Sequence, residues 1–105
     1  MFRPEEVIEN LVLDVREKAE WDFWNCKHAT LVPLGTLPQW LAQNNPPKDK
    51  KIYVFCRSGN RSEMAKNYLI GQGYSQVINL GGVDQLSQVS KMINEKDEYS
   101  GERLP

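Results

Sequence analysis

The run of apolar residues "IYVFC" at positions 52–56 constrains the fold of this chain more than any other stretch. It lacks the alternation of apolar and polar residues that is typical of a strand with one face in water. A strand buried on both faces belongs in a parallel sheet that helices cover. The polar loop "RSGN" follows directly, and the spacing of Met64, Ala65, Tyr68 and Leu69 then predicts the apolar face of a helix.

The rest of the sequence repeats this alternation of short strands and helices. We expect strands at residues 11–15, 29–34 and 76–80, a short helix or turn at 16–24, and helices at 35–43, 61–72 and 84–95. Strands that alternate with helices indicate an α/β domain with a mostly parallel sheet. In such sheets ligands bind where strands end and helices begin, and Cys56 lies at such a point.

The segments between these elements carry turn and cap signals. Thr36 and Asp84 are candidate N-caps, and Gly71 or Gly73 is a candidate C-cap. A sharp turn is expected at "GGV" after the strand at 76–80, and the polar residues 44–51, which include Pro-Pro, are expected to form a linker.

Length and composition limit the classes of protein that this chain can belong to. Its 105 residues fit one domain, residues 1–105, with a polar tail at 96–105 that we expect to fray. The net charge of −1 gives no reason to expect binding to nucleic acid or to an acidic membrane surface. No apolar run approaches the ~18 residues of a membrane span. The N-terminus lacks the apolar core of a signal peptide, so we expect a cytoplasmic protein.

The numbers of cysteines and histidines exclude a disulfide scaffold and a zinc motif with two histidines. Two cysteines, Cys26 and Cys56, are too few for a disulfide scaffold. His28 is the only histidine, which excludes a zinc motif with two histidines. We therefore expect neither a metal nor a cofactor.

The stretch "CRSGNRS", residues 56–62 and referred to below as the cysteine loop, has the composition of an anion site around a thiolate. Gly59 and Asn60 tolerate the unusual backbone angles of a tight turn. The loop N–H groups and those of the first helical turn can then converge on one point. A thiol held there, near Arg57 and Arg61, is expected to have a lowered pKa. Both phosphate-ester hydrolysis and sulfur transfer use such an arrangement.

"CRSGNRS" resembles the active-site loop of single-domain rhodaneses, the thiosulfate-type sulfurtransferases. Three other stretches in the same order extend the resemblance over most of the chain: "LVLDVREKAEW", "HATLVPL" and "VINLGGV". The chain departs from the family pattern at Asn25, Cys26 and His28, where histidine, an apolar residue and glycine are usual. The tryptophan that commonly follows the Gly-Gly pair is replaced by Leu86 or a neighbour.

The resemblance implies a rhodanese-like domain with a central, mostly parallel sheet of about four to five short strands and helices on both faces. It implies that Cys56 is the nucleophile and forms a persulfide. The expected substrate-binding residues are the remainder of the loop: Arg57, Ser58, Gly59, Asn60, Arg61 and Ser62. Asp14 and Arg16 are expected to support the loop through ion pairs.

The length of the loop favours sulfur over phosphorus. The corresponding loop of cysteine phosphatases is one residue longer between the cysteine and the arginine, and only four residues separate Cys56 from Arg61 here. We expect a thiosulfate sulfurtransferase in which Arg57 and Arg61 hold the departing sulfonate. The donor would be thiosulfate or another sulfane-sulfur compound, and the acceptor a thiol, cyanide or a small redox protein. The alternatives are a non-catalytic sulfur carrier or redox sensor and, less favoured, a phosphatase or arsenate reductase of the same fold.

Several other residues have two possible roles. Cys26 is expected to be an inert buried cysteine, and the alternative is a resolving thiol that forms a disulfide with Cys56. Trp21, Trp24 and Trp40 are expected in the core or at the rim of the pocket. For the whole protein we expect a monomer or a weak dimer.

Overall fold

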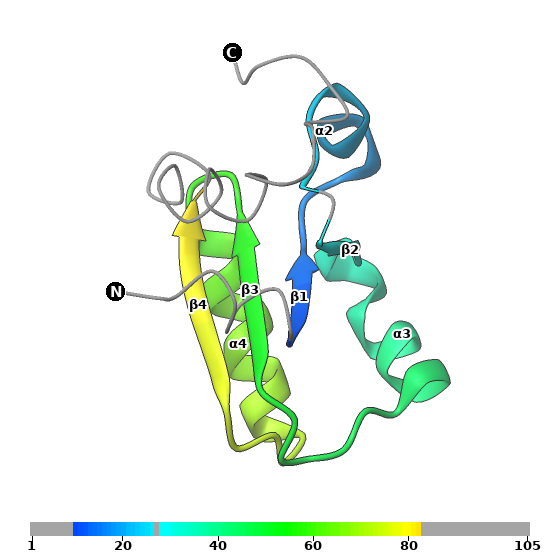
Figure 1. The fold of residues 1–105 in the computed structure, drawn as a ribbon, viewed down its shortest axis with the longest axis vertical. Coiled ribbons are helices and arrows are strands. Elements are labelled where there is room, and N and C mark those ends of the chain that lie inside the picture. Colours follow the sequence, from blue (N-terminus) through cyan, green and yellow to red (C-terminus); the bar gives the residue numbers. More distant parts are fainter. Residues whose placement is uncertain (1–9, 27, 83–105) are drawn as a thin grey trace.

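The sheet of this protein is parallel throughout the residues that the computed structural model describes, which are 10–26 and 28–82. Its strands are β1 (Leu11–Asp14), β2 (Thr30–Leu31), β3 (Ile52–Cys56) and β4 (Val77–Gly82). They are hydrogen-bonded in the order β2-β1-β3-β4 (Figure 1). The predicted α/β class and parallel sheet are therefore confirmed, with the predicted IYVFC strand in a central position.

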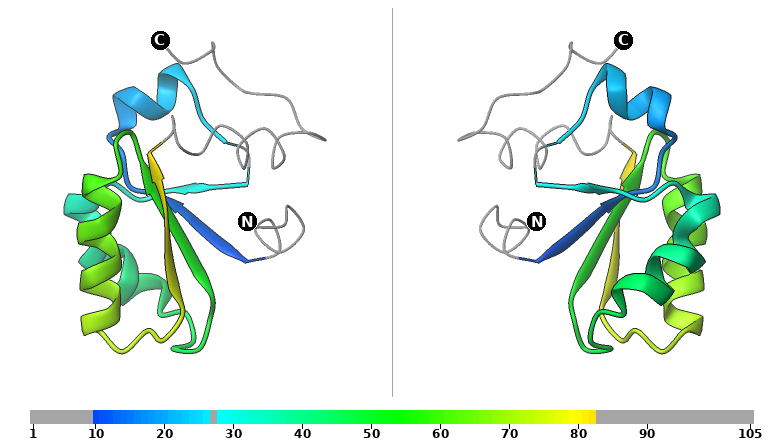
Figure 2. Two further views of the ribbon diagram at one scale, coloured as in Figure 1. Left: turned by 90° about the vertical axis from the view of Figure 1, so that its left-hand side faces the viewer. Right: turned by 90° about the vertical axis from the view of Figure 1, so that its right-hand side faces the viewer.

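Helical segments connect the strands, as the sequence predicts. They are α2 (Lys18–Phe23), the 3₁₀ turn η1 (Leu34–Thr36), α3 (Leu37–Asn44) and α4 (Asn60–Gly71). Helices α3 and α4 lie on one face of the sheet, and α2 lies beyond the end at which β3 and β4 finish (Figure 2). The predicted helix at 84–95, its Asp84 cap and the tail at 96–105 lie outside the described residues. No helix within the described ranges is long and apolar enough to cross a membrane.

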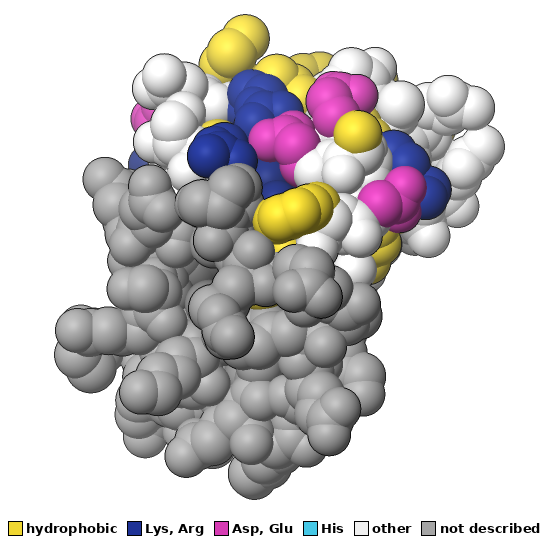
Figure 3. All heavy atoms as spheres, turned by 90° about the horizontal axis from the view of Figure 1, so that it is seen from above, with side chains coloured by type: hydrophobic (Ala, Val, Ile, Leu, Met, Phe, Trp, Pro, Cys, Tyr) yellow, Lys and Arg dark blue, Asp and Glu magenta, His cyan; other side chains and the backbone are white. Residues whose placement is uncertain are grey.

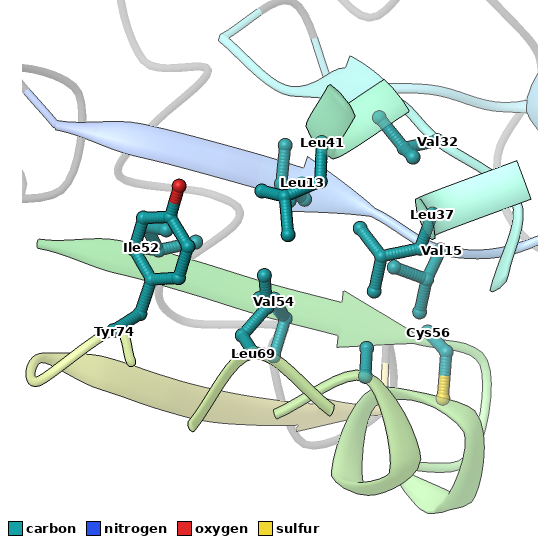
Figure 4. Close-up of a cluster of buried hydrophobic side chains, with 11 residues drawn as sticks. Leu13, Val15, Val32, Leu37, Leu41, Ile52, Val54, Cys56, Leu69 and Tyr74 are labelled. Atoms are coloured by element: carbon teal, nitrogen blue, oxygen red, sulfur yellow. The ribbon is translucent and has the colours of Figure 1, made fainter. Parts of the chain in front are cut away.

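Strand β3 divides the hydrophobic core into two clusters because its successive side chains point to opposite faces of the sheet. Tyr53 and Phe55 belong to one cluster, whereas Ile52, Val54 and Cys56 belong to the other. All residues of β3 are buried, which agrees with the uninterrupted apolar run. Figure 4 shows the second cluster, which α3 and α4 cover.

The first cluster takes in the tryptophans of the segment around α2, whereas Phe23 is exposed. Trp24 is 3% exposed within it, and Trp21 packs against it while partly buried. Trp40 of α3 packs against the second cluster in the same way. Of the two expected places, the core or the rim of the pocket, all three tryptophans take the first: Trp24 lies in the core, and Trp21 and Trp40 pack against it.

Helix α4 buries the predicted apolar face with one exception: Ala65 and Leu69 are buried and Tyr68 packs against the second cluster, but Met64 does not. Its buried residues are Ser62, Ala65 and Leu69, which recur every three to four positions, whereas Met64 is 60% exposed. The prediction for Met64 was wrong because the small Ser62, and not a large apolar residue, faces the sheet in the first turn. This places a hydroxyl group next to the end of β3.

The structure tests the predicted helix caps at Gly73 and Thr36 and the predicted turn at "GGV". Gly73 has φ 99°, the left-handed conformation expected after a helix. Thr36 precedes α3 as predicted, but its hydroxyl donates to the Pro33 carbonyl (2.8 Å) and does not cap the helix. The expected turn at "GGV" was wrong, because β4 continues through Gly82. A register shift opposite Val54 and Phe55 and φ 95° at Gly81 bend the strand there without ending it.

Candidate active site

The Cys56 sulfur is surrounded by hydrogen-bond donors from the loop that follows it. Cys56 is fully buried at the end of β3. The Gly59 N–H donates to Sγ at 2.9 Å and the Ser62 N–H at 3.4 Å, and Ser62 Oγ lies 3.5 Å from the sulfur. In Figure 4 the sulfur lies at the end of the cluster, next to the start of α4. The strand, loop and helix thus form the predicted pocket of donors.

These contacts decide the ionisation of the thiol. Burial raises the pKa of Cys56, but the Ser62 hydroxyl and the amides of Ser62, Gly59 and Ser58 lower it by more, so the pKa falls below its ordinary value. The donors stabilise the thiolate directly and need no histidine base. The arrangement therefore provides a nucleophile that ionises more readily than a free cysteine.

Gly59 gives the loop its shape. Its φ of 99° lies in the left-handed region, which glycine adopts without steric cost. This conformation turns its N–H toward the Cys56 sulfur, while its carbonyl accepts hydrogen bonds from Ser62 Oγ (3.0 Å) and from the Glu63 N–H (3.0 Å). Gly59 thus connects the thiolate to the first turn of α4.

The end of β4 forms a wall against which the cysteine loop packs. A Cβ atom on Gly82 would collide with the backbone carbonyl of Arg57 and would lie 2.8 Å from the Ser58 Cα atom. Asn79 Nδ2 donates to Glu63 (2.9 Å) and, at 3.4 Å, to the Gly59 carbonyl, while Asn79 Oδ1 accepts from the Gly81 N–H (2.8 Å). Sequence analysis assigned no role to Asn79. Of the residues at this end of β4, only the Gly-Gly pair was singled out in the sequence, as part of an expected turn.

Arg61 is paired with an acidic side chain that the sequence did not identify. Its two terminal nitrogens donate to the two carboxylate oxygens of Glu20 in α2, at 2.8 and 3.0 Å. The hydrogen bonds from Arg61 hold the pKa of Glu20 at about 2, so this carboxylate is ionised at neutral pH. Figure 3 views this end of the molecule from above and shows acidic and basic side chains next to one another.

Three of the other predicted substrate-binding residues belong to the loop itself. Arg57, Ser58 and Asn60 are exposed. Arg57 forms no ion pair within the described part of the chain. With respect to the described residues, the loop therefore presents one unpaired guanidinium group, from Arg57, and one that is neutralised, from Arg61.

Asp14 and Arg16 form a buried ion pair, as expected, but Arg16 then contacts Trp24 and not the cysteine loop. Arg16 Nη2 is 2.7 Å from Asp14 Oδ2 and donates to the Trp24 carbonyl at 2.8 Å. The guanidinium group also lies 5.4 Å from the centre of the Trp24 ring. The pair connects the end of β1 to the segment after α2, and none of its hydrogen bonds to described residues reaches the cysteine loop.

The second cysteine lies on the other side of the sheet. Cys26 is buried in the cluster of Tyr53 and Phe55, whereas Cys56 belongs to the opposite cluster, and the two cysteines form no disulfide with each other. This agrees with an inert buried Cys26 and argues against a resolving role. Residues 10–26 and 28–82 contain no group of three potential metal ligands.

The chain is similar in sequence to known proteins over most of its length. The family described as "Rhodanese-like domain" matches residues 3–88. A "Sulfurtransferase" of Allochromatium vinosum is 38% identical over 72 residues, which cover 69% of this chain and 65% of that protein. The "Putative sulfur carrier protein YrkF" of Bacillus subtilis is 36% identical over 69 residues, which cover 66% of this chain and 36% of that protein.

A solved structure shows the same fold. The structure of a rhodanese with anions from E. coli superimposes with a TM-score of 0.66 at 29% identity, and the match covers 71% of this chain and 88% of that one. The chain spans less than two thirds of the length of the two curated relatives above.

Proposed function

Because this chain belongs to the rhodanese-like domain family, we propose that it is a sulfurtransferase that carries sulfane sulfur as a persulfide on Cys56. The observation that carries this proposal is the convergence of the Gly59 and Ser62 N–H groups and the Ser62 hydroxyl on one buried sulfur. These donors stabilise negative charge, first on the thiolate and then on the persulfide that replaces it. The named relatives, a sulfurtransferase and a sulfur carrier protein, support the same class of chemistry.

The reaction has two covalent steps. In the first, the Cys56 thiolate attacks the outer sulfur of thiosulfate, a new S–S bond forms at Sγ, and the S–S bond of thiosulfate breaks with its electron pair leaving on sulfite. In the second, cyanide or a thiolate attacks the outer sulfur of the Cys56 persulfide and regenerates the Cys56 thiolate. Such covalent transfer predicts ping-pong kinetics. The exposed Arg57 guanidinium is the side chain available to meet the anionic donor.

The acidic residue next to the loop supports sulfur transfer over phosphate-ester hydrolysis. A phosphatase needs a protonated acid to donate to the leaving oxygen. Glu20 is the carboxyl group that contacts the loop arginine, and its pKa of about 2 keeps it ionised. Sulfite and thiolates leave without such a proton, so this site has the groups that sulfur transfer needs.

A carrier function is the second candidate. It is favoured by the similarity to the protein named as a sulfur carrier. In this case Cys56 would accept sulfur only from a partner protein and would not turn over with thiosulfate. The two functions share the same loop and differ in the donor.

One assay separates these functions. We expect thiocyanate to form from thiosulfate and cyanide with steady turnover, and we expect Cys56→Ser to abolish it. An absence of turnover together with a mass gain of one sulfur from a cysteine desulfurase would identify a carrier. Hydrolysis of an aryl phosphate at a comparable rate would contradict sulfur transfer.

A further inference from the structure

We propose that Glu20 determines the choice of sulfur donor by withholding Arg61 from the anion. In consequence, a persulfide, which carries at most one negative charge at its reacting end, is a better donor than the thiosulfate dianion. This inference rests on the proposed sulfur transfer by Cys56. It replaces the expectation that Arg57 and Arg61 together hold the departing sulfonate.

The geometry of the pair leaves Arg61 little freedom to bind an anion. Both carboxylate oxygens of Glu20 are used by the guanidinium group, at 2.8 and 3.0 Å, and the two side chains are only 26% and 30% exposed. Glu20 Oε1 also accepts the N–H of Glu17 at 2.9 Å, which fixes the carboxylate to the first turn of α2. A two-pronged pair that is anchored in this way is stronger than an ordinary surface ion pair.

The charges that remain do not suit a dianion. The pKa of the Arg61 guanidinium is raised, mainly by its hydrogen bonds to Glu20. The negative charges of Cys56 and Glu17 raise this pKa further, so Arg61 also interacts with the Cys56 thiolate. The N–H groups of Gly59 and Ser62 already donate to the sulfur. Of the two loop arginines, only Arg57 is unpaired among the described residues. The second charge of thiosulfate would therefore lack a partner among the described residues.

The persulfide reaction balances without any further reactant. The Cys56 thiolate attacks the outer sulfur of R–S–SH and forms a new S–S bond, while the S–S bond of the donor breaks and its electron pair leaves on R–S⁻. The proton of the donor persulfide ends on that leaving thiolate. The products are R–SH and the ionised Cys56 persulfide.

The test compares two donors across three full-length proteins. Steady-state KM is measured with thiosulfate and with glutathione persulfide for the native chain, Glu20→Gln and Asp22→Asn. Glu20→Gln keeps the hydrogen-bonding shape and frees Arg61, so we expect a roughly 3- to 10-fold lower KM for thiosulfate and less than about a twofold change for the persulfide. Asp22→Asn removes the same charge from the same helix at an exposed pair with Lys18. It should change neither value.

The results that would overturn the inference are distinct from those that would overturn the proposed function. An unchanged or higher KM for thiosulfate in Glu20→Gln, or an equal fall in Asp22→Asn, would show that Glu20 has no special role. In the native chain, a kcat/KM for thiosulfate above that for glutathione persulfide would also overturn it, and this measurement needs no variant that folds. A failure of both donors to place sulfur on Cys56 would overturn the proposed function as well.

Discussion

At the scale of single residues, the site depends on groups that aim backbone N–H donors at one sulfur. Gly59 provides the backbone conformation, and Ser62 provides both an N–H and a hydroxyl. The same hydroxyl lies 3.0 Å from the Gly59 carbonyl, to which it donates in the present arrangement. Its hydrogen can therefore turn between the carbonyl and the thiolate, which makes Ser62 the side chain with the most direct effect on Cys56.

Ser62→Ala should raise the pKa of Cys56. The Ser62 hydroxyl gives the largest of the effects that lower this pKa against burial, so its loss leaves burial less opposed. The acid limb of the pH–rate profile should move to higher pH, and activity near neutral pH should fall roughly 3- to 10-fold. The ultraviolet absorbance of the thiolate as a function of pH measures the shift. Ser75→Ala, at the exposed Ser75 beyond α4, is the matched control, and an identical profile for both variants would contradict this role.

Gly82→Ala should displace the cysteine loop. The added Cβ atom would collide with the Arg57 carbonyl and approach the Ser58 Cα atom to 2.8 Å. A shift of this order in the loop is expected to lower kcat/KM about 10²-fold. Thiocyanate formation measures the loss. Gly71→Ala is the control, since nothing lies within 4 Å of its Cβ position, and it should keep full activity.

At the scale of elements, α2 and α4 are joined by the pair of Glu20 and Arg61. These residues are 41 positions apart in the chain. On the other side, β4 supports the loop through Asn79 and Gly82. The loop is therefore held between α2 and β4, and both supports come from outside the strand–loop–helix unit that contains the nucleophile.

Glu20→Gln should destabilise the fold in a way that depends on pH. The folded protein holds the pKa of Glu20 at about 2, below its ordinary value of 4.5. The ionised pair therefore stabilises the fold above pH 4.5, and this stabilisation disappears as the pH falls toward 2. For a partly exposed pair we expect a loss of about 1 kcal/mol in the free energy of unfolding at neutral pH.

Urea denaturation at a series of pH values measures this loss. The difference between the native chain and Glu20→Gln should narrow as the pH falls from 4.5 toward 2. Asp22→Asn removes an exposed pair, with side chains 71% and 57% exposed, and should cost less than about 0.5 kcal/mol. A difference for Glu20→Gln that stays constant with pH would show that packing, and not charge, is lost.

Contacts between residues that are close in the sequence could be predicted from it, whereas contacts between distant segments could not. β3, the loop and α4 are consecutive, so apolar runs and turn residues were enough to place them and to put Cys56 at the end of the strand. The pairing of Glu20 with Arg61 joins two segments whose separate patterns give no sign of it. Gly82 was visible as part of a motif, but its contact with the Arg57 carbonyl depends on the path of β4. Met64 was assigned to the core because hydrophobicity alone did not reveal that Ser62 faces the sheet.

At the scale of the whole molecule, the sheet separates the two cysteines. Cys26 packs with Tyr53 and Phe55 on one face, and Cys56 ends β3 on the other. A disulfide requires facing Cβ atoms and Cα atoms within about 7 Å, which two residues on opposite faces do not provide. Under the proposed sulfur transfer, Cys26 is therefore not placed to accept sulfur from Cys56.

Mild oxidation with hydrogen peroxide should accordingly leave Cys26 and Cys56 unlinked in the folded protein. Cys56, whose pKa lies below its ordinary value, should react to a sulfenic acid, seen as a mass gain of one oxygen. Peptide mapping without reducing agent should find no link between the two cysteines. The same oxidation in denaturant is the control, because an unfolded chain brings the two thiols together and should give the link. A linked peptide from the folded protein would mean that the sheet opens during oxidation, and Cys26 would then regain the resolving role that its position on the opposite face argues against.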